Sequence, residues 1–154
     1  MRIYRTSSSR ETKKLGYKAA KRLLTHKARS AKRRHAVVLA LSGELGSGKT
    51  TFAQGFLSGF GIKKRSASPT FIIFRKFIVH GSWFKNAYHV DAYRIKKPRE
   101  LGALGFGEIL SDPRNIILIE WADQIKEILP GDSIWLKFHH GRRESERKIS
   151  VGGK

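Results

Sequence analysis

The sequence predicts an α/β protein with a largely parallel central sheet, helices flanking it, and an antiparallel hairpin portion. Three observations lead to this fold class. Segments with strand character alternate with segments of helical periodicity. Two of the strand segments, residues 37–41 and 116–119, are apolar at every position, which is typical of parallel strands buried on both faces. A glycine-rich loop follows the first of these strands and leads into a helix.

The first half of the chain begins with a short expected edge strand, Ile3–Thr6. Ser9 or Ser8 then caps an expected helix from about Arg10 to Thr25, because apolar residues recur along one face of it. A basic connector, residues 26–35, leads to the buried strand and the glycine-rich loop. After that loop, aromatic residues at four-residue spacing predict a helix over 50–60, which ends at Gly61: Phe52, Phe56 and Phe60.

The second half reads as strands separated by short helices. We expect a strand over residues 71–79, a turn at Gly81-Ser82 and a partner strand over 87–93. A helical patch is predicted over 98–110, a buried strand over 115–120 and a short helix over 123–129. Residues 134–139 and 148–151 are expected to form the closing hairpin.

The glycine-rich loop carries the strongest functional signal. Residues 43–50 read Gly-Glu-Leu-Gly-Ser-Gly-Lys-Thr and match the phosphate-loop pattern G-x-x-x-x-G-K-[ST] in full. Its position between a buried strand and a helix lets backbone N–H groups and the helix dipole face phosphate oxygens. Lys49 would reach the β- and γ-phosphates, and the Thr50 hydroxyl would bind magnesium. The sequence therefore predicts a P-loop NTPase fold and a site for a nucleoside triphosphate. The alternative is a glycine-rich turn with a coincidental Lys-Thr.

Hydrolysis needs acidic groups near magnesium and water, and a segment that senses the γ-phosphate. Glu120 is expected to bind magnesium, since a buried strand brings it to the edge of the sheet where ligands bind; the alternative is an ordinary solvated acid. Asp91 is expected to support magnesium or the attacking water, the alternative being a salt bridge to Arg94 or Lys49. Thr70 would contact magnesium or the γ-phosphate, unless it only forms a turn.

Composition narrows the class further. With 154 residues we expect one domain, 1–154, that includes a basic N-terminal segment, 1–35. No run of 18 apolar residues is found, so no membrane association is expected, and the absence of cysteine excludes disulfides and thiolate metal sites and favours the cytoplasm. The histidines show no metal-ligand spacing.

The chain is strongly basic, with 32 Lys and Arg residues against 12 Asp and Glu, a net charge of +20. Residues 1–35 hold 13 of the basic residues and a single acid, Glu11, which gives that segment +12. A field of this size attracts polyanions, of which nucleic acid is the natural candidate. The alternatives are a merely solvated basic surface or, for the N-terminus, an organelle transit peptide.

Four segments in this order resemble the TsaE (formerly YjeE) family, bacterial P-loop ATPases of tRNA threonylcarbamoyladenosine biosynthesis. The resemblance covers about residues 9–151 and is carried by the glycine-rich loop with Thr51, by a Ser-Pro-Thr-Phe segment, by His-Val-Asp-Ala-Tyr-Arg and by Ile-Glu-Trp: residues 43–51, 68–71, 89–94 and 119–121. Many NTPases share the loop, whereas the ordered set in so short a chain is far more specific.

The resemblance implies an ATPase, weak alone, that acts within a complex with the threonylcarbamoyl-transferase proteins TsaD and TsaB and resets them between turnovers. It implies that Mg²⁺-ATP is held by a set of loop residues, with Thr70 sensing the γ-phosphate: Gly43, Glu44, Leu45, Gly46, Ser47, Gly48, Lys49, Thr50 and Thr51. Thr50, Glu120 and Asp91 are the implied metal residues, and Lys49, Asp91 and Glu120 the catalytic ones. Trp121 would support the site or the partner surface, unless it is plain core.

The family resemblance does not explain the basic segment 1–35. For it we expect contacts to tRNA phosphates from a group of five residues: Lys27, Arg29, Lys32, Arg33 and Arg34. Two other functions fit the same sequence. One is a small-molecule or nucleoside P-loop kinase, although no Arg-rich lid follows the second strand; the other is a nucleic-acid-binding protein with a regulatory nucleotide site, although RNA-recognition signatures are absent.

Overall fold

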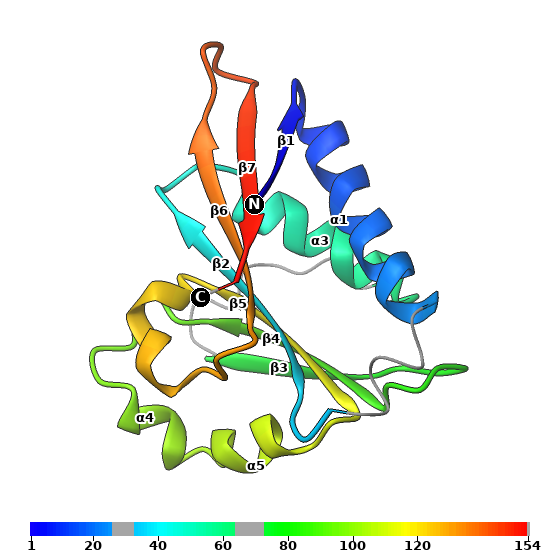
Figure 1. Cartoon of the computed structure of the whole chain (residues 1–154), viewed down its shortest axis with the longest axis vertical. Coiled ribbons are helices and arrows are strands. Elements are labelled where there is room, and N and C mark those ends of the chain that lie inside the picture. The colour runs from blue at the N-terminus through cyan, green and yellow to red at the C-terminus, as the bar shows by residue number, and fades with distance from the viewer. Residues whose placement is uncertain (26–32, 64–72, 154) are drawn as a thin grey trace.

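The computed structural model describes residues 1–25, 33–63 and 73–153 and contains one seven-stranded sheet in the order β1-β7-β6-β2-β5-β4-β3 (Figure 1). The strands are β1 Arg2–Thr6, β2 Val37–Gly43, β3 Phe74–Ile78, β4 Asn86–Asp91, β5 Asn115–Glu120, β6 Ile134–His140 and β7 Arg147–Gly152. The helices are α1 Ser9–Thr25, α3 Lys49–Gly59, α4 Arg99–Gly102, α5 Phe106–Ser111 and the 3₁₀ helix η1 Ala122–Ile128.

The sheet is mixed, and its parallel part is central. The adjacent strands β6, β2, β5 and β4 run parallel, whereas β1, β7 and β3 pair antiparallel at the two edges. The predicted α/β class, the parallel centre and the closing β6–β7 hairpin are therefore confirmed. The antiparallel edges make the sheet as a whole less parallel than expected.

Most element predictions hold, with small corrections. The helical patch expected over 98–110 is divided into α4 and α5, because Gly105 adopts a positive φ of 75° between them. The short helix expected over 123–129 is the 3₁₀ helix η1 over 122–128. Ser8, rather than Ser9, caps α1: its Oγ accepts a hydrogen bond from the N–H of Glu11 at 3.2 Å, while the Glu11 carboxylate accepts one from the N–H of Ser7.

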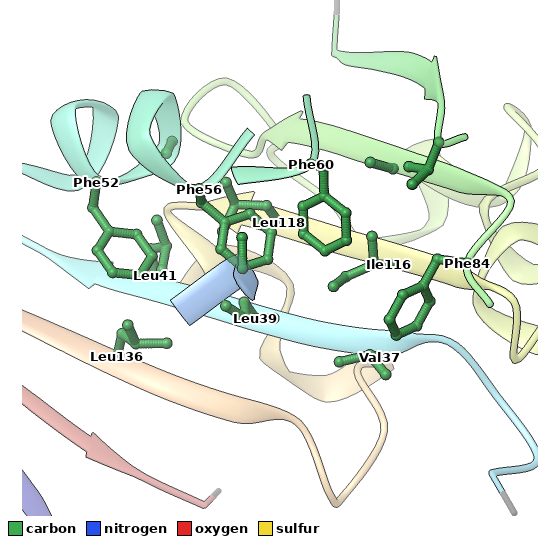
Figure 2. Packing of buried hydrophobic residues seen from close by; sticks show 14 of the residues in the cluster. Val37, Leu39, Leu41, Phe52, Phe56, Phe60, Phe84, Ile116, Leu118 and Leu136 are labelled. Atoms are coloured by element: carbon green, nitrogen blue, oxygen red, sulfur yellow. The ribbon is translucent and has the colours of Figure 1, made fainter. Parts of the chain in front are cut away.

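Two hydrophobic clusters lie on opposite faces of the sheet. On the first face, α3 presents its phenylalanines to β2, β5 and β6, as Figure 2 shows. Ring contacts continue from Phe138 through Phe52, Phe56 and Phe60 to Phe84, with centroid distances of 5.2 to 6.3 Å. The second face is covered by α4, α5 and η1. Burying each of these phenylalanines contributes about 1.5–3 kcal/mol, so the four-residue aromatic spacing seen in the sequence anchors α3 to the sheet.

Helix α1 lies against α3 at a distance that only glycine permits. A Cβ built on Gly55 of α3 would lie 1.9 Å from the carbonyl oxygen of Lys13, and one built on Gly16 of α1 would lie 2.2 Å from the carbonyl oxygen of Phe52. Since α3 begins at Lys49, directly after the glycine-rich loop, this contact also places the start of α1 beside that loop.

Gly55→Ala is expected to lower the free energy of unfolding by about 2 kcal/mol or more. The added methyl group would meet backbone atoms of Lys13, which cannot move unless α1 itself shifts. Gly107→Ala in α5 is the matched control. Its Cβ would meet nothing within 4 Å, so this change should be neutral or stabilise the protein by about 0.5–1 kcal/mol. Urea unfolding of both variants measures the difference; equal effects would show that the α1–α3 contact is not tight.

Candidate functional site

The carboxyl ends of the parallel strands bring three of the expected site residues to one edge of the sheet. Gly43 ends β2, Asp91 ends β4 and Glu120 ends β5. The register pairs Glu120 with Leu41 on one side and with Asp91 on the other. In open α/β sheets, ligands bind at the carboxyl ends of the strands. Nucleotides bind where the connections from neighbouring strands lead to opposite sides of the sheet.

The glycine-rich loop, residues 43–50, wraps the start of α3. Gly43, Gly46 and Gly48 have φ values of 132°, 71° and 99°, which other residues rarely adopt. A Cβ on Gly43 would also lie 2.2 Å from the carbonyl oxygen of Phe138 on β6. The loop therefore depends on its glycines for its shape. It leads directly into an eleven-residue helix, whose N-terminus contributes a partial positive charge.

Lys49 is buried at this helix start, with 4% of its surface exposed. Its Nζ donates hydrogen bonds to the carbonyl oxygens of Gly43 and Glu44, each at 2.7 Å, and lies 3.9 Å from the ring centroid of Trp121. Burial lowers the pKa of Lys49 below its ordinary value, while the negative charges of Glu120, Asp123 and Asp91 oppose that shift. The loop thus holds a buried cation at its centre.

Glu120 is also buried, and both of its carboxylate oxygens have partners. Oε2 accepts a hydrogen bond from the Thr50 hydroxyl at 2.7 Å, and Oε1 lies 2.8 Å from Nε2 of His89. His89 is 1% exposed, and its Nδ1 has no hydrogen-bond partner among the described residues. A tautomer with the hydrogen on Nε2 therefore donates to Glu120 and leaves a bare lone pair at Nδ1, which costs less than an unpaired N–H.

His89 was not predicted to have a role, although it belongs to the His-Val-Asp-Ala-Tyr-Arg segment, residues 89–94. A signal was available, because residues two apart on a strand share a face of the sheet. His89 and Asp91 are such a pair on β4, next to β5. Asp91 itself accepts a hydrogen bond from the N–H of Tyr93 at 3.0 Å. Among the described residues, no ion pair joins it to Lys49.

Trp121 lies against the site in a strained backbone conformation. Its φ of 58° is the sole positive value of a residue other than glycine in the described ranges, and such conformations cost about 1–3 kcal/mol. The ring packs on Tyr93 with a centroid distance of 4.9 Å and covers the Nζ of Lys49. Trp121 thus contacts the loop lysine and lines the cavity beside it, and its role in supporting the site or a partner surface stays a prediction.

The loop lines a cavity of about 160 Å³ with residues from distant parts of the chain. Its walls include the expected Leu45, Gly46, Ser47, Gly48, Lys49, Thr50, Thr51, Glu120 and Trp121. Four further residues come from the start of α1 and from the β6–β7 hairpin: Ser9, Thr12, Ser145 and Arg147. Gly43, Glu44 and Asp91 lie beside the cavity without lining it.

Arg147 connects the β6–β7 hairpin to the loop. Its Nη2 donates to the carbonyl oxygen of Gly46 at 3.0 Å, and its Nη1 donates to the carbonyl oxygen of Glu146 at 2.7 Å. Nothing in the sequence around Arg147 marked it, because its contact with Gly46 joins residues about a hundred positions apart and depends on the tertiary fold.

Some expected residues lie outside the described ranges, namely Thr70 with the Ser-Pro-Thr-Phe segment, and Lys27, Arg29 and Lys32 of the basic connector. Of the remaining connector residues, Arg33 forms an ion pair with Asp132 and Arg34 is exposed. In the ranges that the structure describes, no helix combines the length and apolar character needed to cross a membrane.

Comparison with known proteins matches this architecture to one family. The family model of TsaE, "Threonylcarbamoyl adenosine biosynthesis protein", matches residues 6–149. The crystal structure of Bacillus subtilis YdiB is similar over 97% of this chain and 83% of its own, with a TM-score of 0.67 and 30% identity.

Curated relatives named tRNA threonylcarbamoyladenosine biosynthesis protein TsaE agree. The Haemophilus influenzae protein is 37% identical over 95 residues, 62% of this chain and 58% of its own length. The Bacillus subtilis protein is 36% identical over 113 residues, 73% of this chain and 67% of its own. The Rickettsia conorii protein is 40% identical over 128 residues, 82% of this chain and 65% of its own. The match thus covers less than two thirds of the H. influenzae and R. conorii proteins.

Proposed function

The chain belongs to the TsaE family, and from this premise we propose that it binds and hydrolyses Mg²⁺-ATP as a subunit of the machinery that makes threonylcarbamoyladenosine in tRNA. The observation that carries the proposal is the joining of Lys49, Thr50 and Glu120 around one cavity at the N-terminus of α3. A buried lysine, a hydroxyl and a carboxylate at the start of a helix supply the phosphate and magnesium contacts that such a reaction needs.

Lys49 is the phosphate contact in this proposal. Its buried Nζ hydrogen-bonds to the carbonyl oxygens of Gly43 and Glu44 inside the loop. These two neutral acceptors are weaker partners for an ammonium group than a triphosphate is. The side chain therefore turns toward the β- and γ-phosphates when ATP binds, while the loop backbone and the helix dipole hold the remaining phosphate oxygens.

Thr50 and Glu120 fit magnesium. Their hydroxyl and carboxylate oxygens lie 2.7 Å apart, and both are the hard oxygen donors that this ion prefers. In the described residues, no group of three or more acidic, histidine or cysteine side chains is arranged to hold a metal alone. Sharing the ion with nucleotide phosphates and water agrees with that, since magnesium usually needs one or two carboxylates from the protein. When bound, it would neutralise charge on the phosphates.

His89 holds Glu120 in position. Its Nε2–H occupies Oε1 of the carboxylate, so that Oε2 faces Thr50 and the cavity. Because His89 is buried and lies on a central strand, its ring has little rotational freedom. The hydrogen bond to this fixed ring therefore also fixes the orientation of the Glu120 carboxylate. His89 is not among the residues that line the cavity, so in this proposal it acts as a positioning residue.

Within the complex, the transfer chemistry belongs to partner subunits of the TsaD and TsaB type, and ATP turnover on this chain resets them. Thr70 would report the γ-phosphate to the surface that the partners contact. The exposed ring of Tyr93, packed on Trp121, lies next to the nucleotide site and would sense its occupancy. Activity of the isolated chain is accordingly expected to be weak.

Lys49→Ala and Thr50→Ala should each reduce ATP turnover by about 10²-fold or more, because they remove the phosphate and magnesium contacts. Calorimetry of ATP binding with and without magnesium, together with phosphate release, measures both effects. Thr50→Ala should lose the magnesium dependence of binding, whereas Lys49→Ala should lose affinity in either condition. Turnover like that of the wild type in Lys49→Ala would sink the assignment, and phosphorylation of an added acceptor would favour a kinase.

Glu120→Gln should slow hydrolysis much more than it weakens ATP binding, and His89→Phe should act in the same direction with a smaller loss. His89→Gln keeps a side-chain N–H that can reach the carboxylate, so it should recover part of the rate. A second readout is Mn²⁺ binding in the presence of ADP, followed by electron paramagnetic resonance. If His89→Phe binds Mn²⁺ and hydrolyses ATP like the wild type, the positioning role is wrong.

Asp91→Asn should reduce the rate of hydrolysis and leave ATP affinity nearly unchanged, because Asp91 lies beside the cavity rather than in its wall. Its place next to Glu120 in the register suits a carboxylate that orients water or magnesium-bound water. Single-turnover hydrolysis at saturating ATP separates this effect from binding. An unchanged single-turnover rate would remove Asp91 from the reaction.

A further inference from the structure

One face of the β1-β7-β6 part of the sheet is not covered by any described helix. On these three strands, alternate residues face α1 and α3; Phe138 and Ile149 among them are 0% exposed, and Tyr4, Ile134 and Val151 are partly buried. The residues between them point to the opposite face. There the hydrophobic cluster beneath α4, α5 and η1 takes Trp135 from β6 and no residue from β1 or β7. Figure 1 shows these strands extending away from α4 and α5.

This open face presents cations in register. Arg5 of β1 lies directly opposite Lys148 of β7, and Lys148 lies directly opposite His139 of β6. In the next row Lys137 lies opposite Ser150. Arg5, Lys137, His139 and Lys148 are all exposed. The sequences of the three strands, RIYRT, IWLKFHH and RKISVG, contain no Asp or Glu.

Cations placed opposite one another repel, so this arrangement is unfavourable unless an anion binds between them. Directly opposed side chains on an antiparallel pair have Cβ atoms about 4.5–5.5 Å apart, and like charges there are destabilising. The ion pairs formed by the described residues include none with Arg5, Lys137 or Lys148. The cations on α1 differ, because they project from a solvated helix, and Arg33 of the connector is already paired with Asp132.

We propose that the open face of β1, β7 and β6 binds the phosphate backbone of RNA, with Arg5, Lys137 and Lys148 as its main contacts. Neighbouring strands lie about 4.8 Å apart, and side chains on one face of a strand recur about every 6.8 Å, so the face offers a flat array of cations to a repeating polyanion. The face lacks exposed aromatic rings for base stacking, which favours backbone contacts to a folded RNA over sequence reading. The choice of tRNA as the RNA rests on the proposed function.

The test compares two variants that each replace one Arg and two Lys by Gln. The first is Arg5→Gln/Lys137→Gln/Lys148→Gln on the open face. The control is Arg10→Gln/Lys14→Gln/Lys18→Gln on the exposed side of α1, which removes the same charge elsewhere. Binding of an unmodified tRNA transcript to the full chain, without nucleotide, is measured by fluorescence anisotropy across a salt series.

The open-face variant should bind tRNA at least about 10-fold more weakly, and its log–log salt slope should flatten by about 2 to 3 units, one for each lost contact. The control should keep a slope near that of the wild type. Equal losses in both variants would mean general attraction by net charge, and no loss in the open-face variant would exclude the site; either result overturns the proposal. Normal tRNA binding combined with lost binding to a TsaD–TsaB preparation would identify the face as a protein-docking surface instead.

Two readouts separate these results from misfolding and from failure of the proposed function. The thermal midpoint of the open-face variant at low salt should equal or exceed that of the wild type, because opposed cations have been removed. A lower midpoint would show that the cations serve stability, against the proposal. ATP turnover should be unchanged in this variant, since none of its three positions lines the nucleotide cavity. Because tRNA binding is measured without ATP, its outcome does not depend on whether the chain is an ATPase.

Discussion

The buried carboxylate of Glu120 holds together the three elements that meet at the site. Through Thr50 it is tied to the start of α3, and through His89 to the middle of β4, while it ends β5 itself. A buried charge of this kind is costly unless each oxygen is satisfied, and here both are. The position of the glycine-rich loop therefore follows from the packing of the parallel strands, because those strands decide where Glu120, His89 and Thr50 can meet.

The rest of the fold supports this arrangement of Glu120, His89 and Thr50, and two residues near the site adopt energetically unfavourable states. The phenylalanine contacts of α3, and the close approach of Gly16 to Phe52 and of Gly55 to Lys13, fix the helix that begins at Lys49. Around the loop, Trp121 is held at a positive φ and Lys49 is buried against carbonyl oxygens. Strain and buried charge at one place, supported by a well-packed core elsewhere, are typical of a site arranged for a ligand.

The sequence was sufficient for what depends on local pattern. Apolar runs, aromatic spacing and Gly61 located the strands and α3, and the loop motif with strand-end acids located Gly43, Asp91 and Glu120 at one edge. The sequence could not predict contacts that form only in the tertiary fold. Arg147 reaches Gly46 from the far end of the chain, and the partner of His89 depends on which strand lies beside β4. The division of the predicted helix over 98–110 depends on the positive φ of Gly105, which the periodicity of apolar residues cannot predict.

The central claim is that Lys49, now bonded to loop carbonyls, is the group that receives the triphosphate. A crystal structure with magnesium and a non-hydrolysable ATP analogue tests it most directly. We predict that the Lys49 Nζ leaves the carbonyl oxygens of Gly43 and Glu44 and lies within hydrogen-bond distance of β- or γ-phosphate oxygens, with the ion beside Thr50 and Glu120. A bound analogue whose phosphates lie elsewhere, with Lys49 still bonded to both carbonyls, would contradict it.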